Sequence, residues 1–128
     1  MSEVPTKVTK FVHENFATVD ELRVFLLLCR SPDKEWDTWT ISSMLYLKPD
    51  IVTIVLVNLQ EKGLLVNIAG KERVYKYSPK DAGVDGLVQK VVELDQTQPV
   101  TLINLVYSKP KGVQAFADAF NLGKNKEK

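Results

Sequence analysis

Residues 36–78 decide the fold, and they read WDTWTISSMLYLKPDIVTIVLVNLQEKGLLVNIAGKERVYKYS. Apolar residues recur twice at helical spacing, and β-branched and aromatic residues then alternate along two short runs. The pattern predicts a helix over residues 38–46, a tight turn over 47–50, a second helix over 49–62 and a hairpin whose two strands cover 64–68 and 73–78. Ile41, Met44 and Leu45 are expected on the inner face of the first helix, and residues 36–38 are either a short strand or the entry to that helix. The rest of the chain is expected to pack around this unit.

The ends of these elements carry the residues that such ends require. Asp37 is a suitable N-cap, because its carboxylate can accept a free amide of the first turn. Pro49 suits a first helical position, since its φ is already helical and it lacks an amide hydrogen. Gly63 is the expected C-terminal residue of the second helix, and Gly70 supplies the conformational freedom of the hairpin loop.

The flanking segments are predicted to be helical. A capping box at Thr18 and Glu21 begins a helix over 19–30 that is apolar on most of its circumference, so it belongs at the centre of the core. An amphipathic helix is expected before it, and helices from Asp81 onward, with Pro99 interrupting or restarting the pattern. The expected organisation is an N-terminal helix over 1–17, a central domain over 18–80, C-terminal helices over 81–122 and a tail over 123–128. The C-terminal helices include one over 113–122 that carries Phe116 and Phe120.

Composition excludes several classes of protein. The 128 residues are 45% hydrophobic and 26% charged with a net charge of +1, which indicates a single globular domain. The absence of a signal sequence and of a long apolar run predicts a cytoplasmic protein without a membrane span. Cys29 is the only cysteine and His13 is the only histidine. We therefore expect no metal site and no cofactor, and we do not expect the protein to be an enzyme.

The helix–turn–helix order raises the possibility of DNA binding, since the second helix of such a unit enters the major groove. Residues 40–80 carry six basic and three acidic side chains, a local excess of +3. Cations in the turn, at the end of the helix and at the hairpin tip could contact phosphates, while two polar side chains of the helix could reach bases. The expected DNA-binding residues are Lys48, Thr53, Asn58, Lys62, Lys71 and Arg73.

The same helix also favours a different partner. With Val52, Val55, Leu56 and Leu59 facing inward, its outward face holds Ile54 and Val57, no Lys or Arg, and the acids Asp50 and Glu61. Exposed apolar side chains usually mark a protein-binding surface. Ile54 and Val57 are therefore the candidate partner-binding residues, and a protein-interaction module without DNA binding is the alternative function.

Residues 21–78 resemble the winged helix-turn-helix domains of bacterial regulators of the MarR-like type. The resemblance rests on the Leu-rich first helix, on Ile41 and Leu45, on the Pro49 helix, and on the junction LQEKGLL over 59–65. It implies an α+β, mostly helical winged helix with extra N- and C-terminal helices. It also implies a homodimeric transcriptional regulator that binds double-stranded DNA and dimerises through its terminal helices.

The C-terminal helices have a seam that suits dimerisation. Four apolar residues between 84 and 94 follow a 3-4-3 spacing, and the run from Val100 to Tyr107 is strongly apolar. The expected dimer interface comprises Val84, Leu87, Val91, Leu94, Leu102 and Ile103. The alternative is that residues 100–107 fold back to cover the core of their own chain.

Overall fold

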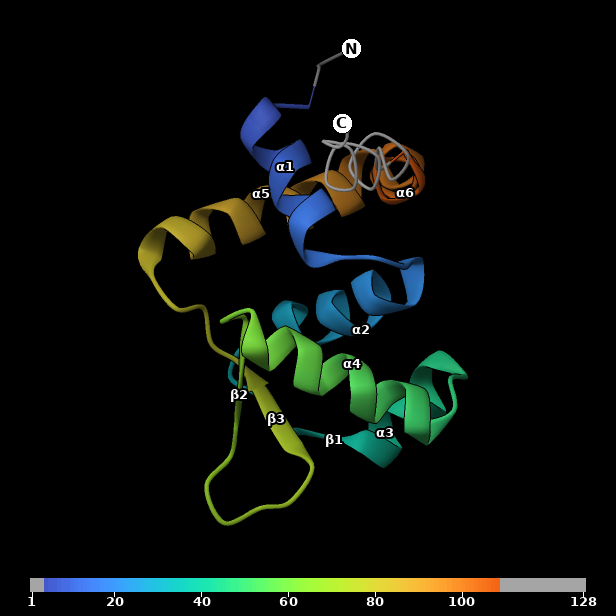
Figure 1. Cartoon of the computed structure of the whole chain (residues 1–128), viewed down its shortest axis with the longest axis vertical. Helices are drawn as coiled ribbons and strands as arrows, with labels where there is room; N and C mark the ends of the chain where they lie inside the picture. The colour runs from blue at the N-terminus through green and yellow to red at the C-terminus, as the bar shows by residue number, and fades with distance from the viewer. Residues whose placement is uncertain (1–3, 109–128) are drawn as a thin grey trace, which may run out of the picture.

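The computed structural model of the chain describes residues 4–108, which form an α+β structure that is mostly helical (Figure 1). This part of the chain contains six helices and one three-stranded sheet. In chain order the elements are α1 (Thr6–Asn15), α2 (Val19–Arg30), β1 (Trp36–Asp37), α3 (Thr38–Leu45), α4 (Pro49–Glu61), β2 (Leu65–Asn67), β3 (Val74–Tyr77), α5 (Ala82–Thr97) and α6 (Pro99–Tyr107).

Helix α2 lies between two groups of elements. Figure 1 shows α1, α5 and α6 gathered at one end, and α3, α4 and the sheet at the other. Both groups contact α2, and all buried apolar residues belong to one continuous hydrophobic cluster. The apolar circumference of α2 is therefore covered on both sides, and the predicted central position of this helix is confirmed.

The sheet has the order β1–β3–β2, with both pairs antiparallel. Trp36 lies opposite Tyr75, and Leu65 lies opposite Tyr77, so bulky side chains meet across the strands on the core side. Residues 36–37, which the sequence left open between a strand and a helix entry, form one of the two edge strands and then lead directly into α3.

The predicted helix caps are confirmed. Thr18 Oγ1 accepts a hydrogen bond from the Glu21 amide at 3.1 Å, and the Glu21 carboxylate accepts one from the Ala17 amide at 2.7 Å. Asp37 and Asp81 cap α3 and α5 through amides three residues on, at 2.7 Å and 2.8 Å. Gly63 follows α4 with a φ of +81°, and a side chain there would also collide with Lys80.

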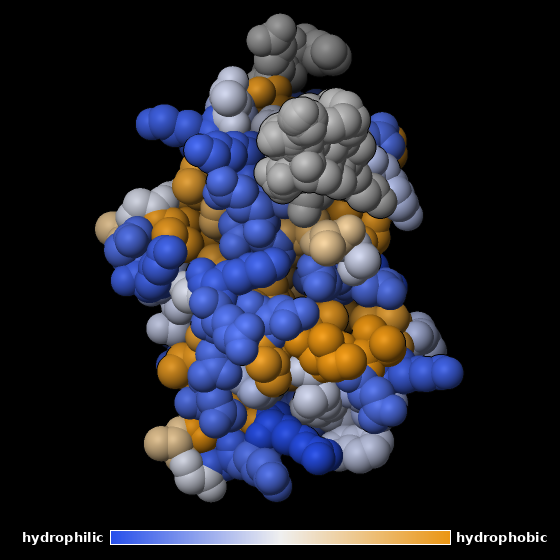
Figure 2. Space-filling view, viewed as in Figure 1, coloured by the Kyte–Doolittle hydropathy of each residue, from blue (hydrophilic) through white to orange (hydrophobic). Residues whose placement is uncertain are grey.

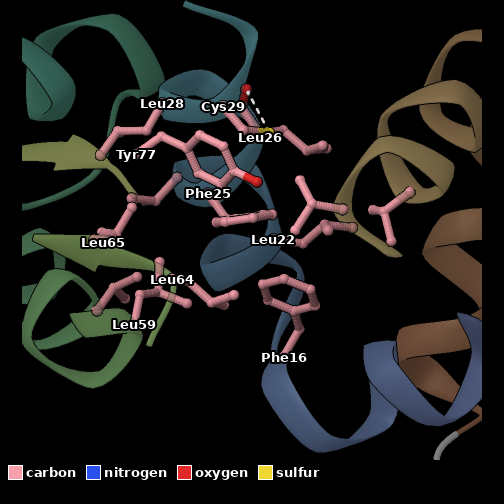
Figure 3. Packing of buried hydrophobic residues seen from close by; sticks show 14 of the residues in the cluster. Phe16, Leu22, Phe25, Leu26, Leu28, Cys29, Leu59, Leu64, Leu65 and Tyr77 are labelled. Carbon is pink, nitrogen blue, oxygen red and sulfur yellow. Dashed lines mark hydrogen bonds between the residues drawn. The ribbon is translucent and has the colours of Figure 1, made fainter. Parts of the chain in front are cut away.

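Aromatic rings fill the centre of the core (Figure 3). Phe25 of α2 lies between Phe16 and Tyr77, with ring centroids 5.2 Å and 6.0 Å away. Cys29, on the same helix, is buried, and its Sγ donates to the Leu26 carbonyl as the dashed line in Figure 3 shows. The core therefore joins the N-terminal segment, α2 and the sheet.

One expectation about the core is wrong, and one lies outside the described residues. Met44 was expected on the inner face of α3, but its side chain is exposed, because α3 is only eight residues long and buries just Thr38 and Ile41. The predicted helix over 113–122 falls beyond the described part of the chain. Pro99 separates α5 from α6 and begins the latter.

Candidate partner-binding surface

The two faces of α4 differ sharply in exposure. Val52, Val55, Leu56 and Leu59 are buried in the core, as predicted. Opposite them, Ile51, Ile54 and Val57 are 41%, 58% and 37% exposed. We call these three residues the α4 outer face. Figure 2 shows hydrophobic side chains gathered on the surface over α4.

Exposed aromatic and apolar side chains continue onto α3 and the turn after it. Trp39 and Met44 are largely exposed, and Tyr46 is 93% exposed. Tyr46 also adopts a left-handed conformation, with φ 58° and ψ 43°, at the C-terminal end of α3. This conformation costs most residues about 1 kcal/mol relative to glycine or asparagine. Neither burial nor backbone geometry therefore accounts for a tyrosine at this position.

Two shallow hollows adjoin the N-terminal turn of α2. One, of about 250 Å³, lies between α4 and the first turn of α2. Its lining comprises Ile51, Ile54 and Val55 of α4 and Thr18, Asp20 and Glu21 at the start of α2. The other, of about 350 Å³, extends toward the end of α6 and is lined by Ala17, Thr18, Val19, Asp20, Val106 and Tyr107. Thr18 and Asp20 line both hollows, one of which extends toward α6 and the other toward α4; we call the two hollows together the α2 groove.

The charged side chains around this apolar surface are mostly acidic but include Arg23 and Lys48. Asp20 and Glu21 line the α2 groove, while Asp50 and Glu61 are exposed at the two ends of α4. Arg23 lies 3.6 Å from Asp20 and donates to the Leu45 carbonyl at 3.1 Å, so it partly balances that charge. The surroundings of the α4 outer face suit an apolar partner with basic flanks.

The four cations expected to contact DNA phosphates lie at the two ends of α4 and in the hairpin, and two of them are engaged within the chain. Lys48 is exposed at the N-terminal end of α4. Lys62, at the other end of α4, is half-buried and donates to the Asn15 carbonyl at 2.7 Å, which fastens α4 to α1. Lys71 pairs with Glu35 at 2.9 Å. Arg73 is exposed in the hairpin, with a positive φ of 63°.

The two candidate base-reading residues are only half-exposed. Thr53 donates its hydroxyl to the Pro49 carbonyl one turn earlier, at 3.0 Å, so its proton is already used within α4. Asn58 lies on the same helix and is also half-buried. Both side chains are less exposed than Ile54.

Most residues of the expected dimer interface lie against their own chain. Val91 and Leu102 are fully buried, Leu94 is nearly so, and Val84 and Leu87 pack at the edge of the same cluster. His13 of α1 donates from Nε2 to the Leu105 carbonyl at 2.9 Å, which joins α1 to α6. These contacts fit the alternative in which α6 covers its own core. Of the six residues, Ile103 has the largest exposed fraction, and Val100 and Tyr107 on the same helix are also exposed.

The titratable groups with shifted pKa values serve the fold. Burial raises the pKa of the Cys29 thiol to about 12. Burial and the hydrogen bond to Asp85 raise the pKa of Tyr77 well above its usual range. The Thr40 amide lowers the pKa of Asp37, the α3 cap. Within residues 4–108, acidic, His and Cys side chains do not form a cluster of three or more that could hold a metal ion.

Comparisons with protein-family models, with curated proteins and with solved structures found no match to this chain. In the described part of the chain, no single helix is long and apolar enough to cross a membrane; α3 and α4 together are, but they are bent by 115° at their junction.

The sequence pointed to Ile54 and Val57 but missed the rest of the exposed apolar surface. Ile51 lies beside the core stripe of α4, where spacing alone cannot separate a buried residue from an exposed one. Met44 was assigned to the inner face of α3, and Trp39 lies two residues after the cap of that helix. The exposure of Tyr46 was predictable in principle, because this residue directly precedes the Leu-Lys-Pro turn.

Proposed function

We propose that residues 18–80 form a winged helix-turn-helix module that binds a partner protein through the exposed face of α3 and α4. The observation that carries the proposal is the α4 outer face, three apolar side chains on the helix that would otherwise be a recognition helix. Large exposed apolar side chains that burial does not explain are typical of a partner site.

The order of elements supports the winged-helix part of the proposal. The chain bends by 115° between α3 and α4, and the β2–β3 hairpin follows α4 directly. β1 precedes α3 and pairs with β3, so the hairpin is tied to the start of the helix–turn–helix unit. The unit therefore presents α4 on an outer surface rather than between layers.

The chemistry around α4 specifies the partner. Ile54 and its neighbours would accept a helix or extended segment with apolar side chains at helical or alternate spacing. Asp20, Glu21, Asp50 and Glu61 would favour Lys or Arg at the edges of that segment. The expected partner is a protein segment that is apolar in the middle and basic at its flanks.

Substitution on matched exposed sites tests the proposal. Immobilised wild-type protein, Ile54→Asp and Val100→Asp would each capture proteins from a nuclease-treated lysate of the source cells. Val100 is a suitable control because it is 68% exposed on α6, away from α4. We expect capture by wild type and Val100→Asp and loss with Ile54→Asp. Equal capture by all three proteins would contradict the proposal.

Double-stranded DNA is the second candidate partner, in the role of a homodimeric transcriptional regulator. The observation that favours it is the local charge of +3 over residues 40–80, with Lys48 and Arg73 both exposed. Three observations weigh against DNA as the partner. Lys62 is bound to the Asn15 carbonyl, Lys71 is paired with Glu35, and α4 carries acidic side chains.

A salt titration separates the two candidates. If DNA is the partner, binding to a labelled duplex should weaken steeply between 50 and 200 mM salt, by roughly tenfold or more for even two or three phosphate contacts. It should weaken further in Lys48→Glu and Arg73→Glu. For the protein-binding module we expect no duplex binding even at low salt, measured by fluorescence anisotropy.

A further inference from the structure

The α2 groove begins where the described chain ends. Val106 and Tyr107 line its α6 end, and Ser108 follows them directly. Thr18 and Asp20 line the hollow at this end and also the second one, which Ile51 and Ile54 of α4 line. Any segment that continues from Ser108 thus starts beside an apolar, acid-lined groove and needs no linker to reach it.

The sequence after Ser108 has the composition that this groove would accept. Val113, Phe116, Ala117 and Phe120 follow the i, i+3, i+4, i+7 spacing of a helix that docks by one apolar face. Residues 109–128 also carry five lysines against two carboxylates, a net charge of +3. Two of those lysines, Lys109 and Lys111, come just before the apolar stripe in the sequence. The groove that would receive the segment carries the carboxylates of Asp20 and Glu21.

The length of the segment sets how far it can reach. Phe116 is eight residues beyond Ser108, a distance of at most about 26–29 Å if extended and about 12 Å if helical. The two hollows share Thr18 and Asp20, so a segment that enters the hollow beside Tyr107 lies next to the hollow beside Ile51.

We propose that residues 109–122 dock in the α2 groove of their own chain, with Phe116 and Phe120 against the hollows that Val106, Tyr107, Ile51 and Ile54 line. The docked segment covers part of the α4 outer face and competes there with the partner. In this last respect the inference rests on the proposed function. A basic, amphipathic segment of the chain would then be an internal mimic of the partner.

Methyl NMR with a spin label tests the docking in the full chain. The chain has five isoleucines, at 41, 51, 54, 68 and 103, so each labelled δ1 methyl is resolvable. A nitroxide would be attached at Asn121→Cys. The native Cys29 should react slowly, since it is buried, and labelling of the wild-type chain controls for it. We expect the label to broaden Ile51 and Ile54 and to leave Ile68 of the hairpin sharp.

A tail variant provides the matched control without touching the folded core. Phe116→Ser with Phe120→Ser should abolish the broadening at Ile51 and Ile54. Broadening that persists in this variant, or sharp Ile51 and Ile54 signals in the parent, would overturn the docking. Mixing spin-labelled chains without ¹³C with ¹³C-labelled chains tests the occupant: broadening in that mixture would assign the groove to the tail of a second copy and overturn the same-chain proposal.

Partner capture distinguishes this inference from the proposed function. The Phe116→Ser, Phe120→Ser chain should capture several-fold more partner than wild type, with the same loss on Ile54→Asp. If the methyls broaden but neither chain captures protein, the docking stands and the proposed function fails. If capture depends on Ile54 while Ile51 and Ile54 stay sharp, the proposed function stands and the docking fails.

Discussion

Helices α2 and α4 are both apolar around most of their circumference, yet only α2 is buried on both sides. α2 lies between the α1–α5–α6 group and the α3–α4–sheet group, and six of its twelve residues are buried. α4 has the core on one side only, so Ile51, Ile54 and Val57 face outward. The comparison teaches that apolar residues all around a helix indicate burial only where a second layer exists; otherwise they indicate a surface that another molecule could cover.

The largest expected effect tests the difference between the two faces of α4. Leu56→Ala removes a fully buried side chain and should lower the free energy of unfolding by about 2–5 kcal/mol. Ile54→Ala, on the outer face of the same helix, should change it by less than about 0.5 kcal/mol. Urea denaturation measures both. Similar losses for the two variants would show that α4 is covered on both sides.

Lys62 and Lys48, at opposite ends of α4, differ in the same way. Lys62→Met keeps the apolar stem but leaves the Asn15 carbonyl without its charged donor, so we expect a loss of roughly 1.5 kcal/mol. Lys48→Met, at an exposed position, should have almost no effect on stability. Thermal or urea unfolding of the pair would decide whether Lys62 has the structural role; no difference between them would count against it.

The cap of α3 should make stability depend on acid pH. Because the folded-state pKa of Asp37 lies below its ordinary value of 3.8, its carboxylate stabilises the fold above that pH, and the contribution is lost as the pH falls through the folded-state pKa. Asp37→Ala should cost about 1 kcal/mol near neutral pH. Its deficit relative to wild type should shrink as the pH is lowered, whereas Asp33→Ala, in the exposed loop before β1, should show neither effect.

Replacement of Tyr46 should improve stability slightly. Tyr46→Gly relieves a left-handed conformation that costs a non-glycine residue about 1 kcal/mol, while the side chain it removes is almost fully exposed. The flexibility that glycine adds to the unfolded chain offsets part of this gain, so we expect at most about 0.5–1 kcal/mol. A marked loss of stability would mean that Tyr46 packs against the fold after all. If the proposed function is correct, the same change should weaken partner capture.

The smallest effect is expected at the hairpin tip. Lys71 and Glu35 form an exposed ion pair, and such pairs typically contribute about 0–1 kcal/mol. A double-mutant cycle with Lys71→Ala and Glu35→Ala should therefore give a coupling below about 0.5 kcal/mol that fades at high salt. A larger, salt-insensitive coupling would show that the hairpin is anchored more firmly to the loop before β1 than the exposure of the pair suggests.

Local chemistry made most of the fold predictable. Thr18, Asp37, Asp81 and Gly63 each act through a backbone group within a few residues, so the sequence around them contained all the partners involved. The inner stripe of α4 was equally clear from its spacing. Met44 was misassigned because α3 is too short for its periodicity to separate the inner from the outer side.

The candidate site was less predictable because it depends on neighbours far away in sequence. Lys62 reaches a carbonyl 47 residues earlier, and Lys71 pairs with a carboxylate 36 residues earlier. Nothing near either lysine indicates that it has such a partner. The α2 groove likewise combines residues of the α1–α2 connection, α2, α4 and α6.

The sequence by itself determined the order of the elements, their ends and the central place of α2, because capping, proline, glycine and apolar spacing act over a few residues. Only the tertiary structure decided which apolar residues stay exposed and which cations are engaged. Those outcomes depend on which layers meet, and it is the absence of a layer over the outer side of α4 in the described chain that leaves Ile51, Ile54 and Val57 available to a partner.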